Sequence, residues 1–198
     1  MMRRFALLLA LLCAALPAFA QDAAPVAAPA AAPVAAPAAE PAPAVEKTPA
    51  TPTSSAWNTF FPDGLINSAG EKVELSVLDN KIVGLYFSAH WCPPCRAFSP
   101  KLVEFRNKNK DQFEVVFISS DKNETAQFEY MKEVGMEWPT MKHRSEAANA
   151  LAEKFGVQGI PTLIILSPTG ETVSTSGRMD VTDNPDGCIA KWKEGPAK

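Results

Sequence analysis

Three short runs of apolar residues stand out in the second half of the chain, at residues 82–87, 115–118 and 163–166. Each run is continuous and rich in β-branched or aromatic side chains. Such runs are typical of strands that are buried on both faces of a sheet. A further strand is expected at about residues 171–175, after the turn signal at residues 167–170. The pattern therefore predicts a small, largely buried sheet.

Between these strands, apolar residues recur at helical spacing. One set follows residue 95, a second follows Asp121 and Glu124, which have the spacing of a capping box, and a third lies between Ser145 and Gly156. A closing helix is expected at residues 183–192. Alternating strands and helices predict an α/β fold in which a central sheet is covered by helices on both faces.

The first 20 residues have the layout of an export signal. Arg3 and Arg4 precede an apolar run at residues 5–16, and small residues then provide a cleavage pattern, so cleavage is predicted after Ala20. The apolar run is shorter than the roughly 20 residues that a membrane-spanning helix needs. An uncleaved membrane anchor is the disfavoured alternative. Cys13 lies inside the apolar run and is interpreted as part of the signal, not as a lipid attachment site.

Residues 21–53 form a low-complexity segment rich in Ala and Pro, with prolines at positions 25, 29, 33, 37 and 41. This composition cannot build a core, so we predict a disordered linker. A semi-rigid spacer and a solubilising tail are equally compatible with it. Export predicts a periplasmic or otherwise exported protein in an oxidising compartment, whose contact with a membrane is transient and made by the signal peptide.

Composition and charge narrow the possible partners. The formal net charge is −3, from 19 basic and 22 acidic residues. A mildly acidic balance without basic runs argues against nucleic acid as the main partner. All 10 Gly lie after residue 53, and the remaining stretch is long enough for one well-buried core and short for two. We therefore expect one folded domain at residues 54–198.

The candidate chemistry begins after Trp91, where Cys92, Pro93, Pro94 and Cys95 follow in order. A Cys pair at this spacing, directly after a buried strand and at the start of a helix, puts the first sulfur where free N–H groups and the helix dipole favour the thiolate. The thiolate is the nucleophile in disulfide exchange. We expect Cys92 to be the exposed attacking thiol and Cys95 to be the resolving thiol, with the two prolines stiffening the turn.

A static disulfide and half of a zinc site are the structural alternatives for this pair. A disulfide that closes so small a loop adds little stability. A zinc site needs four ligands, and the remaining candidates, His90, His143 and Cys188, form no second paired motif. A redox pair is favoured. No metal and no organic cofactor are expected, because the dithiol is itself the redox centre.

The residues around the pair resemble the thioredoxin superfamily, and within it the tryparedoxin/nucleoredoxin branch. The resemblance is carried by residues 86–96, 98–102, 113–121 and 154–162, and it covers roughly residues 65–178. It implies a thioredoxin fold, with a central mixed β-sheet flanked by helices on both faces. It also implies dithiol–disulfide exchange with protein thiols and disulfides.

The resemblance also implies a substrate-binding surface. Ile160 and Pro161 correspond to the superfamily's cis-proline turn, and a cis bond is reasonable because such bonds are essentially confined to X–Pro. The turn would present the Ile160 backbone to an extended substrate. Trp91 corresponds to the aromatic residue that flanks the active site, and Pro93 and Pro94 complete this surface.

Two positions depart from ordinary thioredoxins. Tyr86 stands six residues before Cys92, where those proteins carry a buried carboxylate that relays protons, so their proton route is not carried over. His90 replaces a small or acidic residue. Its imidazolium would favour the Cys92 thiolate, and a solvated loop side chain is the alternative. The export signal and the Ala/Pro-rich segment are unlike the cytosolic members, so a trypanothione-type electron donor is not carried over, and the donor or acceptor is expected to be an unidentified thiol.

Four other residues are assigned structural roles. Cys188 is expected to be a buried free thiol that acts as a small hydrophobe, and Trp138 is expected to pack in the core. Arg178 and His143 are expected to be solvated, His143 in an exposed basic loop.

The combined prediction is an exported thiol–disulfide oxidoreductase that acts on protein disulfides. Two other classes stay open. One is a binding module whose Cys pair is permanently oxidised, and the other is a copper or other metal chaperone that uses Cys92, Cys95 and His90. The direction of electron flow is not determined by these residues, because couples of this fold span from about −270 to about −120 mV.

Overall fold

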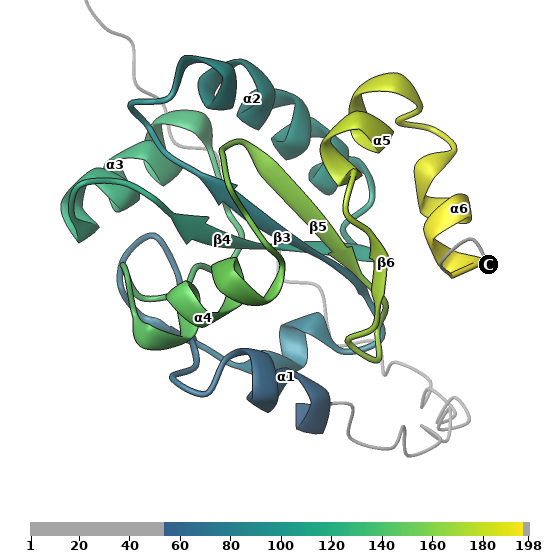
Figure 1. Cartoon of the computed structure of the whole chain (residues 1–198), viewed down its shortest axis with the longest axis horizontal. Coiled ribbons are helices and arrows are strands. Elements are labelled where there is room, and N and C mark those ends of the chain that lie inside the picture. The colour runs from purple at the N-terminus through teal and green to yellow at the C-terminus, as the bar shows by residue number, and fades with distance from the viewer. Residues whose placement is uncertain (1–53, 196–198) are drawn as a thin grey trace, which may run out of the picture. The chain divides into compact units, whose positions relative to one another are not determined.

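A four-stranded sheet organises the part of the chain that this computed structural model describes, residues 54–195 (Figure 1). Its strands lie in the spatial order β4-β3-β5-β6 and are β3 (Ile82–Ser88), β4 (Phe113–Ser119), β5 (Thr162–Leu166) and β6 (Thr172–Ser174). Strand β3 pairs in parallel with β4 and antiparallel with β5, and β5 pairs antiparallel with β6. The predicted mixed sheet is confirmed. The predicted export signal and linker, residues 1–20 and 21–53, lie outside the described residues.

Helices cover both faces of the sheet, as predicted. The helices on one face are α2 (Pro93–Lys108), α3 (Glu124–Val134), α5 (Gly177–Asp183) and α6 (Cys188–Lys193). The elements on the other face are α1 (Ser54–Phe60), the 3-10 helix η1 (Leu75–Leu78) and α4 (Glu146–Lys154). A short hairpin of β1 (Leu65–Ile66) and β2 (Lys72–Val73) follows α1.

Strand β3 divides the hydrophobic core into two clusters, because successive side chains of a strand point to opposite faces. Tyr86 packs in the cluster on the α2 face, and its neighbours Leu85 and Phe87 pack in the cluster on the α4 face. Gly84 allows close packing within the first cluster. A Cβ atom there would lie 2.9 Å from the Phe113 ring, so a larger residue would force the neighbouring side chain to move.

The predicted helix starts are confirmed in one case and wrong in another. Ser145 caps α4 as expected, and its Oγ accepts a hydrogen bond from the Ala148 N–H. The capping box at Asp121 is wrong. Asn123 is the N-cap residue of α3, and its side chain accepts from the Ala126 N–H. Asp121 is engaged elsewhere, because its carboxylate joins the loops that follow β3 and β4.

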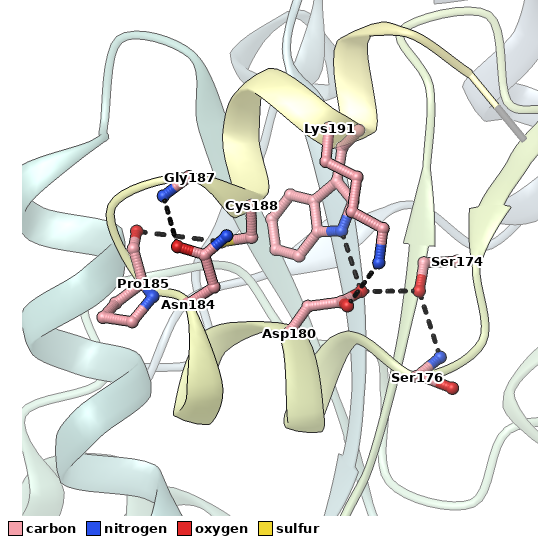
Figure 2. Close-up of polar contacts among 9 residues, drawn as sticks. Ser174, Ser176, Asp180, Asn184, Pro185, Gly187, Cys188 and Lys191 are labelled. Carbon is pink, nitrogen blue, oxygen red and sulfur yellow. Dashed lines mark hydrogen bonds and ion pairs between the residues drawn. The ribbon is translucent and has the colours of Figure 1, made fainter. Parts of the chain in front are cut away.

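The single closing helix predicted at residues 183–192 is wrong. The chain forms α5 and α6 with a turn at residues 184–187 between them (Figure 2). Pro185 explains the break, since proline lacks an N–H and disfavours a helical conformation in the residue before it. Asn184 stabilises the turn, because its side-chain oxygen accepts from the Gly187 N–H and its carbonyl accepts from the Cys188 N–H.

The first 28 or so residues of the domain were not predicted to form regular structure, and they form several short elements. Trp57, Phe60 and Phe61, at and after α1, pack in the α4-face cluster. These elements are 7, 2, 2 and 4 residues long, and such short segments show no clear hydrophobic period. Within residues 54–195, no helix is long and apolar enough to cross a membrane.

Candidate active site

Cys92 and Cys95 lie at the start of α2 and are joined by a disulfide, with their Cα atoms 5.2 Å apart. Cys92 is the N-cap residue of the helix. Its Sγ accepts a hydrogen bond from the backbone N–H of Cys95 at 3.3 Å. The first sulfur therefore lies at the positive end of the helix dipole.

Pro93 and Pro94 are the first two helical residues, and both are exposed. Proline is favoured at the first helical position because an N–H there would have no partner within the helix. Neither proline carries an N–H, so the first helical N–H available to the Cys92 sulfur is that of Cys95.

The disulfide is more deeply buried than we expected from the sequence. Cys92 is 3% exposed and Cys95 is 0% exposed, and both pack with Ala89 and Ile160. The expectation of an exposed Cys92 is therefore wrong for this oxidised form, because neighbouring loops close over the pair. Of the two cysteines, only Cys92 retains any solvent-exposed surface. An incoming thiol would therefore reach Cys92 before Cys95.

The turn at Ile160 and Pro161 lies beside the disulfide. The peptide bond between these two residues is cis, which confirms that prediction. The Cys92 Sγ is 3.8 Å from the carbonyl oxygen of Ile160. Both turn residues are half-buried, so this backbone borders the sulfur and still has an open side.

Trp91 projects from the loop before the disulfide. Its side chain is 59% exposed, and its Nε1 donates a hydrogen bond to the carbonyl oxygen of Ser120 at 3.2 Å. That single bond fixes the indole against the loop after β4 and leaves most of the ring facing solvent.

The loops that follow β3 and β4 are joined through Asp121. Its Oδ1 accepts from the backbone N–H of His90 at 2.8 Å, and its Oδ2 accepts from the Ser119 hydroxyl at 2.8 Å. The carbonyl of Asp121 lies 2.8 Å from Nε2 of His143. The neighbouring Lys142 and Arg144 are exposed, as expected for a basic loop, but His143 itself is half-buried and is not the solvated side chain that was expected.

The His90 imidazole contacts α3. Its Nε2 lies 2.8 Å from a carboxylate oxygen of Glu133, and the ring stacks on Tyr130 with 5.3 Å between centroids. The side chain is therefore held in place, unlike the solvated loop side chain that was one of two alternatives. Its contacts are with Glu133 and Tyr130, and its influence on the Cys92 thiolate stays a prediction.

A buried chain of hydroxyl groups includes Tyr86, the residue that stands in place of the thioredoxin carboxylate. The Ser99 Oγ lies 2.7 Å from the Tyr86 hydroxyl and 2.6 Å from the Tyr130 hydroxyl. A longer contact of 3.4 Å joins Tyr130 to Ser88. Burial raises the pKa of Tyr86 above its ordinary value of 10.0. Tyr86 thus remains a neutral hydrogen-bonding group across the physiological pH range.

Ser99, Asp121 and Tyr130 were not identified as site residues from the sequence. A signal for two of them was present. Ser99 lies four residues after Cys95, on the same face of α2. Asp121 follows β4, whose parallel pairing with β3 brings the carboxyl ends of the two strands to one edge of the sheet. Tyr130 had no comparable signal, because only the tertiary packing of α3 brings it to this place.

The remaining predicted residues lie away from the disulfide or at its margin. Trp138 and Cys188 are buried in the core, as predicted. Arg178, expected to be solvated, is half-buried and lines a hollow next to Pro94. Among residues 54–195, no group of three or more His, Cys, Asp or Glu side chains has a geometry that could hold a metal ion.

The amino-acid sequence is similar to those of a known family of proteins. A family model described as thioredoxin-like matches residues 80–172. Nucleoredoxin from Bos taurus is 40% identical over 136 residues, which are 67% of this chain and 31% of the bovine protein. Tryparedoxin from Trypanosoma brucei brucei is 42% identical over 132 residues, which are 65% of this chain and 90% of the tryparedoxin. The chain thus matches about a third of the length of nucleoredoxin.

Solved structures agree with these matches. Tryparedoxin II from C. fasciculata superimposes with a TM-score of 0.62 at 33% identity, over 69% of this chain and 92% of that structure. A thioredoxin from Wuchereria bancrofti superimposes with a TM-score of 0.57 at 40% identity, over 66% of this chain and 93% of that structure. The similarity in fold therefore extends over nearly the whole of each relative's solved domain.

Proposed function

Because the chain belongs to the thioredoxin-like family of thiol–disulfide oxidoreductases, in the branch of the nucleoredoxins and tryparedoxins, we propose that it exchanges disulfides with protein substrates through Cys92 and Cys95. One observation carries the proposal. The Cys92 sulfur caps α2, receives the Cys95 N–H and borders the Ile160 carbonyl. This sulfur is therefore stabilised as a thiolate and lies next to backbone that an extended substrate can pair with.

In the reducing direction, the exchange has two steps. The Cys92 thiolate attacks one sulfur of the substrate disulfide, forms a mixed disulfide with it and releases the other sulfur as a thiolate, which takes up a proton. The Cys95 thiolate then attacks the Cys92 sulfur, closes the Cys92–Cys95 disulfide and releases the second substrate thiol. Two electrons pass from the protein to the substrate, and a separate thiol donor must restore the dithiol. Oxidation of a substrate dithiol is the same sequence in reverse.

Four neighbouring residues have roles in the proposed substrate contact. Trp91, Pro93 and Pro94 form the exposed surface in front of the sulfurs, and the Ile160 backbone lies on the other side of Cys92. A substrate strand between these two borders would bring its disulfide to the Cys92 side, where the site retains its exposure. The redox centre in this proposal is the Cys pair itself, without a metal or an organic cofactor.

The proposed setting is the periplasm or another exported compartment, with protein thiols and disulfides as substrates. The support is the export-signal pattern at residues 1–20. An oxidising compartment would keep the resting protein in the disulfide form, so a reductive role there would depend on electrons supplied by a thiol partner.

The test is a redox titration of the full chain. The protein is equilibrated in graded glutathione buffers, free thiols are alkylated, and the state of each cysteine is read by peptide mass. We expect a reversible two-electron couple at Cys92 and Cys95. A potential below about −230 mV would identify a reductant, and one above about −150 mV would identify an oxidant. A pair that titrates in neither direction would overturn the proposal and favour the redox-inert binding module.

A further inference from the structure

Two hollows adjoin the segment that carries the two cysteines, and they lie on opposite sides of the first turns of α2. The hollow on the Trp91 side has a volume of about 340 Å³ and includes Arg96 and Lys122. The hollow on the Met179 side has a volume of about 240 Å³ and includes Lys101 and Arg178. The second hollow is lined by residues of α2 and α5, and these two helices pack side by side (Figure 1).

Helix geometry separates the two hollows. Pro94 and Lys101 are seven residues apart and share one face of α2, on the side of the second hollow. Arg96 lines the first hollow. At about 100° per residue, Arg96 lies about 160° around the helix from Pro94. The segment that contains the two cysteines is therefore flanked on both sides.

Each hollow combines one exposed apolar side chain with two cations. Within residues 54–195, the exposed large apolar side chains are Trp91 at 59% and Met179 at 48%, and each borders one of the hollows. Aromatic residues, Met and Arg are enriched where protein surfaces bind partners. The two exposed large apolar side chains of the described surface thus lie in the hollows on either side of the segment that carries the dithiol.

The flanking charge is positive, although the chain as a whole has a net charge of −3. The acid in the first hollow, Asp121, is 1% exposed, and its carboxylate already accepts hydrogen bonds from His90 and Ser119. Glu133, exposed nearby, is paired with the His90 imidazole. No acid lines the second hollow. A docked substrate would therefore meet cations on both sides of its disulfide.

The positive character is confined to the end of the α2–α5 groove that lies next to the dithiol. Farther along α2, the groove continues past Glu104 and past Lys108, whose Nζ is paired with Asp186 at 2.7 Å. Charges there are mixed or already paired. Within this groove, the unpaired cations Lys101 and Arg178 thus lie at the end that adjoins Pro94, next to the segment that carries the two cysteines.

We propose, resting on the proposed function, that the protein selects extended substrate segments in which acidic and apolar residues flank the target cysteine on both sides. The acidic side chains would lie against Arg96 and Lys122 on one side and against Lys101 and Arg178 on the other. Apolar side chains next to the cysteine would contact Trp91 and Met179. Complementary charge of this kind guides encounter and orients the partner.

The experiment uses the reduced full chain and three short synthetic peptides. Each peptide has a central Leu-Cys-Leu whose sulfur is joined to 2-thiopyridine, flanked by Asp, by Ser or by Lys. Exchange with Cys92 releases pyridine-2-thione, which is followed by its absorbance. The chain is reduced beforehand and freed of reductant, and the second-order rate constant of the single turnover is taken as kcat/KM, because a free dithiol would attack these activated disulfides directly. At low salt we expect kcat/KM to be about tenfold higher for the Asp peptide than for the Lys peptide, with the Ser peptide between them. The preference should decrease as salt screens the charges.

Two variants decide whether these cations are responsible. The double variant Lys101→Glu with Lys122→Glu should lose or reverse the preference for the Asp peptide. Lys110→Glu is the matched control, because Lys110 is exposed beyond the far end of α2, and it should keep the preference. Equal kcat/KM for all three peptides with the unaltered chain, or an unchanged preference in the double variant, would overturn the proposal. A chain that exchanges with none of the peptides and fails the glutathione titration would instead overturn the proposed function.

Discussion

The chain begins two of its helices with a cysteine, and the two surroundings differ. Cys92 caps α2, a helix of 16 residues, and its sulfur receives a backbone N–H. Cys188 is the first residue of α6 and is 1% exposed (Figure 2). Burial, reinforced by the carboxylate of Asp180, raises the pKa of the Cys188 thiol from 9.0 to about 11.

This comparison shows that a helix start does not by itself activate a thiol. Near Cys188, desolvation and the negative charge of Asp180 oppose ionisation more strongly than the backbone N–H groups and Lys191 favour it. Near Cys92, the cations Arg96 and Lys122 line the hollow beside Trp91, and the exposed acid Glu133 is paired with the His90 imidazole. Because both cysteines are buried, the charges and hydrogen-bond donors around a helix start separate a reactive cysteine from a structural one.

The strongest test of this difference removes each sulfur in turn. Cys92→Ser should reduce disulfide exchange to the uncatalysed rate, because the attacking thiolate is lost. Cys95→Ser should accumulate a mixed disulfide between Cys92 and the substrate, because nothing resolves it. Cys188→Ser should retain full exchange. The measurements are peptide-disulfide turnover and the mass of the trapped adduct.

The contrast between Cys95→Ser and Cys188→Ser makes this test decisive, since both changes remove one buried sulfur. Loss of exchange in Cys188→Ser, with the fold intact by circular dichroism, would show that the third thiol takes part in the reaction.

Alkylation rates provide a second test of the comparison. At pH 8, a thiol with a pKa of about 11 is only about 0.1% ionised. We expect iodoacetamide to modify Cys92 of the reduced chain at least about 100-fold faster than Cys188. Mass mapping of the peptides separates the two cysteines from Cys13 and Cys95. In guanidinium the rates should converge, and similar rates in the folded protein would contradict the proposed difference.

Asp180 provides a third test, because its carboxylate hydrogen-bonds to α6 and its charge disfavours the Cys188 thiolate. Its carboxylate accepts hydrogen bonds from Ser174, Lys191 and Trp192, at 2.7, 2.8 and 3.0 Å (Figure 2). Burial alone would raise the pKa of Asp180, but these hydrogen bonds outweigh it and hold the pKa below the ordinary value of 3.8. Asp180→Asn should lower the free energy of unfolding at pH 7 by about 2–4 kcal/mol, as measured by urea unfolding.

The pH dependence of the free energy of unfolding shows the direction in which Asp180 acts. A carboxyl group with a lowered pKa in the folded state contributes stability above its unfolded pKa, and that contribution is lost as the pH falls through the folded pKa. The difference in the free energy of unfolding between the unaltered chain and Asp180→Asn should therefore shrink as the pH falls below about 4. The same variant should also ionise Cys188 at a lower pH. Asp183→Asn, a substitution on the exposed part of α5, is the control and should change neither property.

The sequence was most informative where the elements are long and periodic. The apolar runs predicted β3, β4 and β5, and the resemblance around residues 86–96 and 154–162 predicted the fold and the cis bond at Pro161. Periodicity was less informative at the two ends of the domain. There, α1, β1 and β2 are too short to show a period, and Pro185 divides the segment expected to form a single closing helix.

The parts of the site that were missed depend on tertiary contacts. Asp121 was interpreted from local spacing as a capping residue, but its carboxylate bonds to the His90 N–H, 31 residues earlier in the chain. The contact between Ser99 and Tyr130 also spans 31 residues. The first contact arises from the parallel pairing of β3 with β4, and the second from the packing of α2 and α3 on the sheet. A pattern along one segment of the sequence does not show either of them.

The smallest expected effect concerns the buried hydroxyl groups of Tyr86, Ser99 and Tyr130. Ser99 belongs to α2, the helix that Cys92 caps. Ser99 contacts both Tyr86 and Tyr130, so Ser99→Ala leaves two buried tyrosine hydroxyls short of a partner and should lower the free energy of unfolding by about 1–3 kcal/mol. Tyr130→Phe is the matched variant. It leaves Ser99 bonded to Tyr86, so it should lower the free energy of unfolding by about 1 kcal/mol or less. Equal losses of the free energy of unfolding in urea would contradict a central role for Ser99.

The pH profile of the exchange rate should be the same in both variants as in the unaltered chain, with no ionisation added or removed near pH 7. The reason is that this chain has hydroxyl groups where ordinary thioredoxins have a carboxylate.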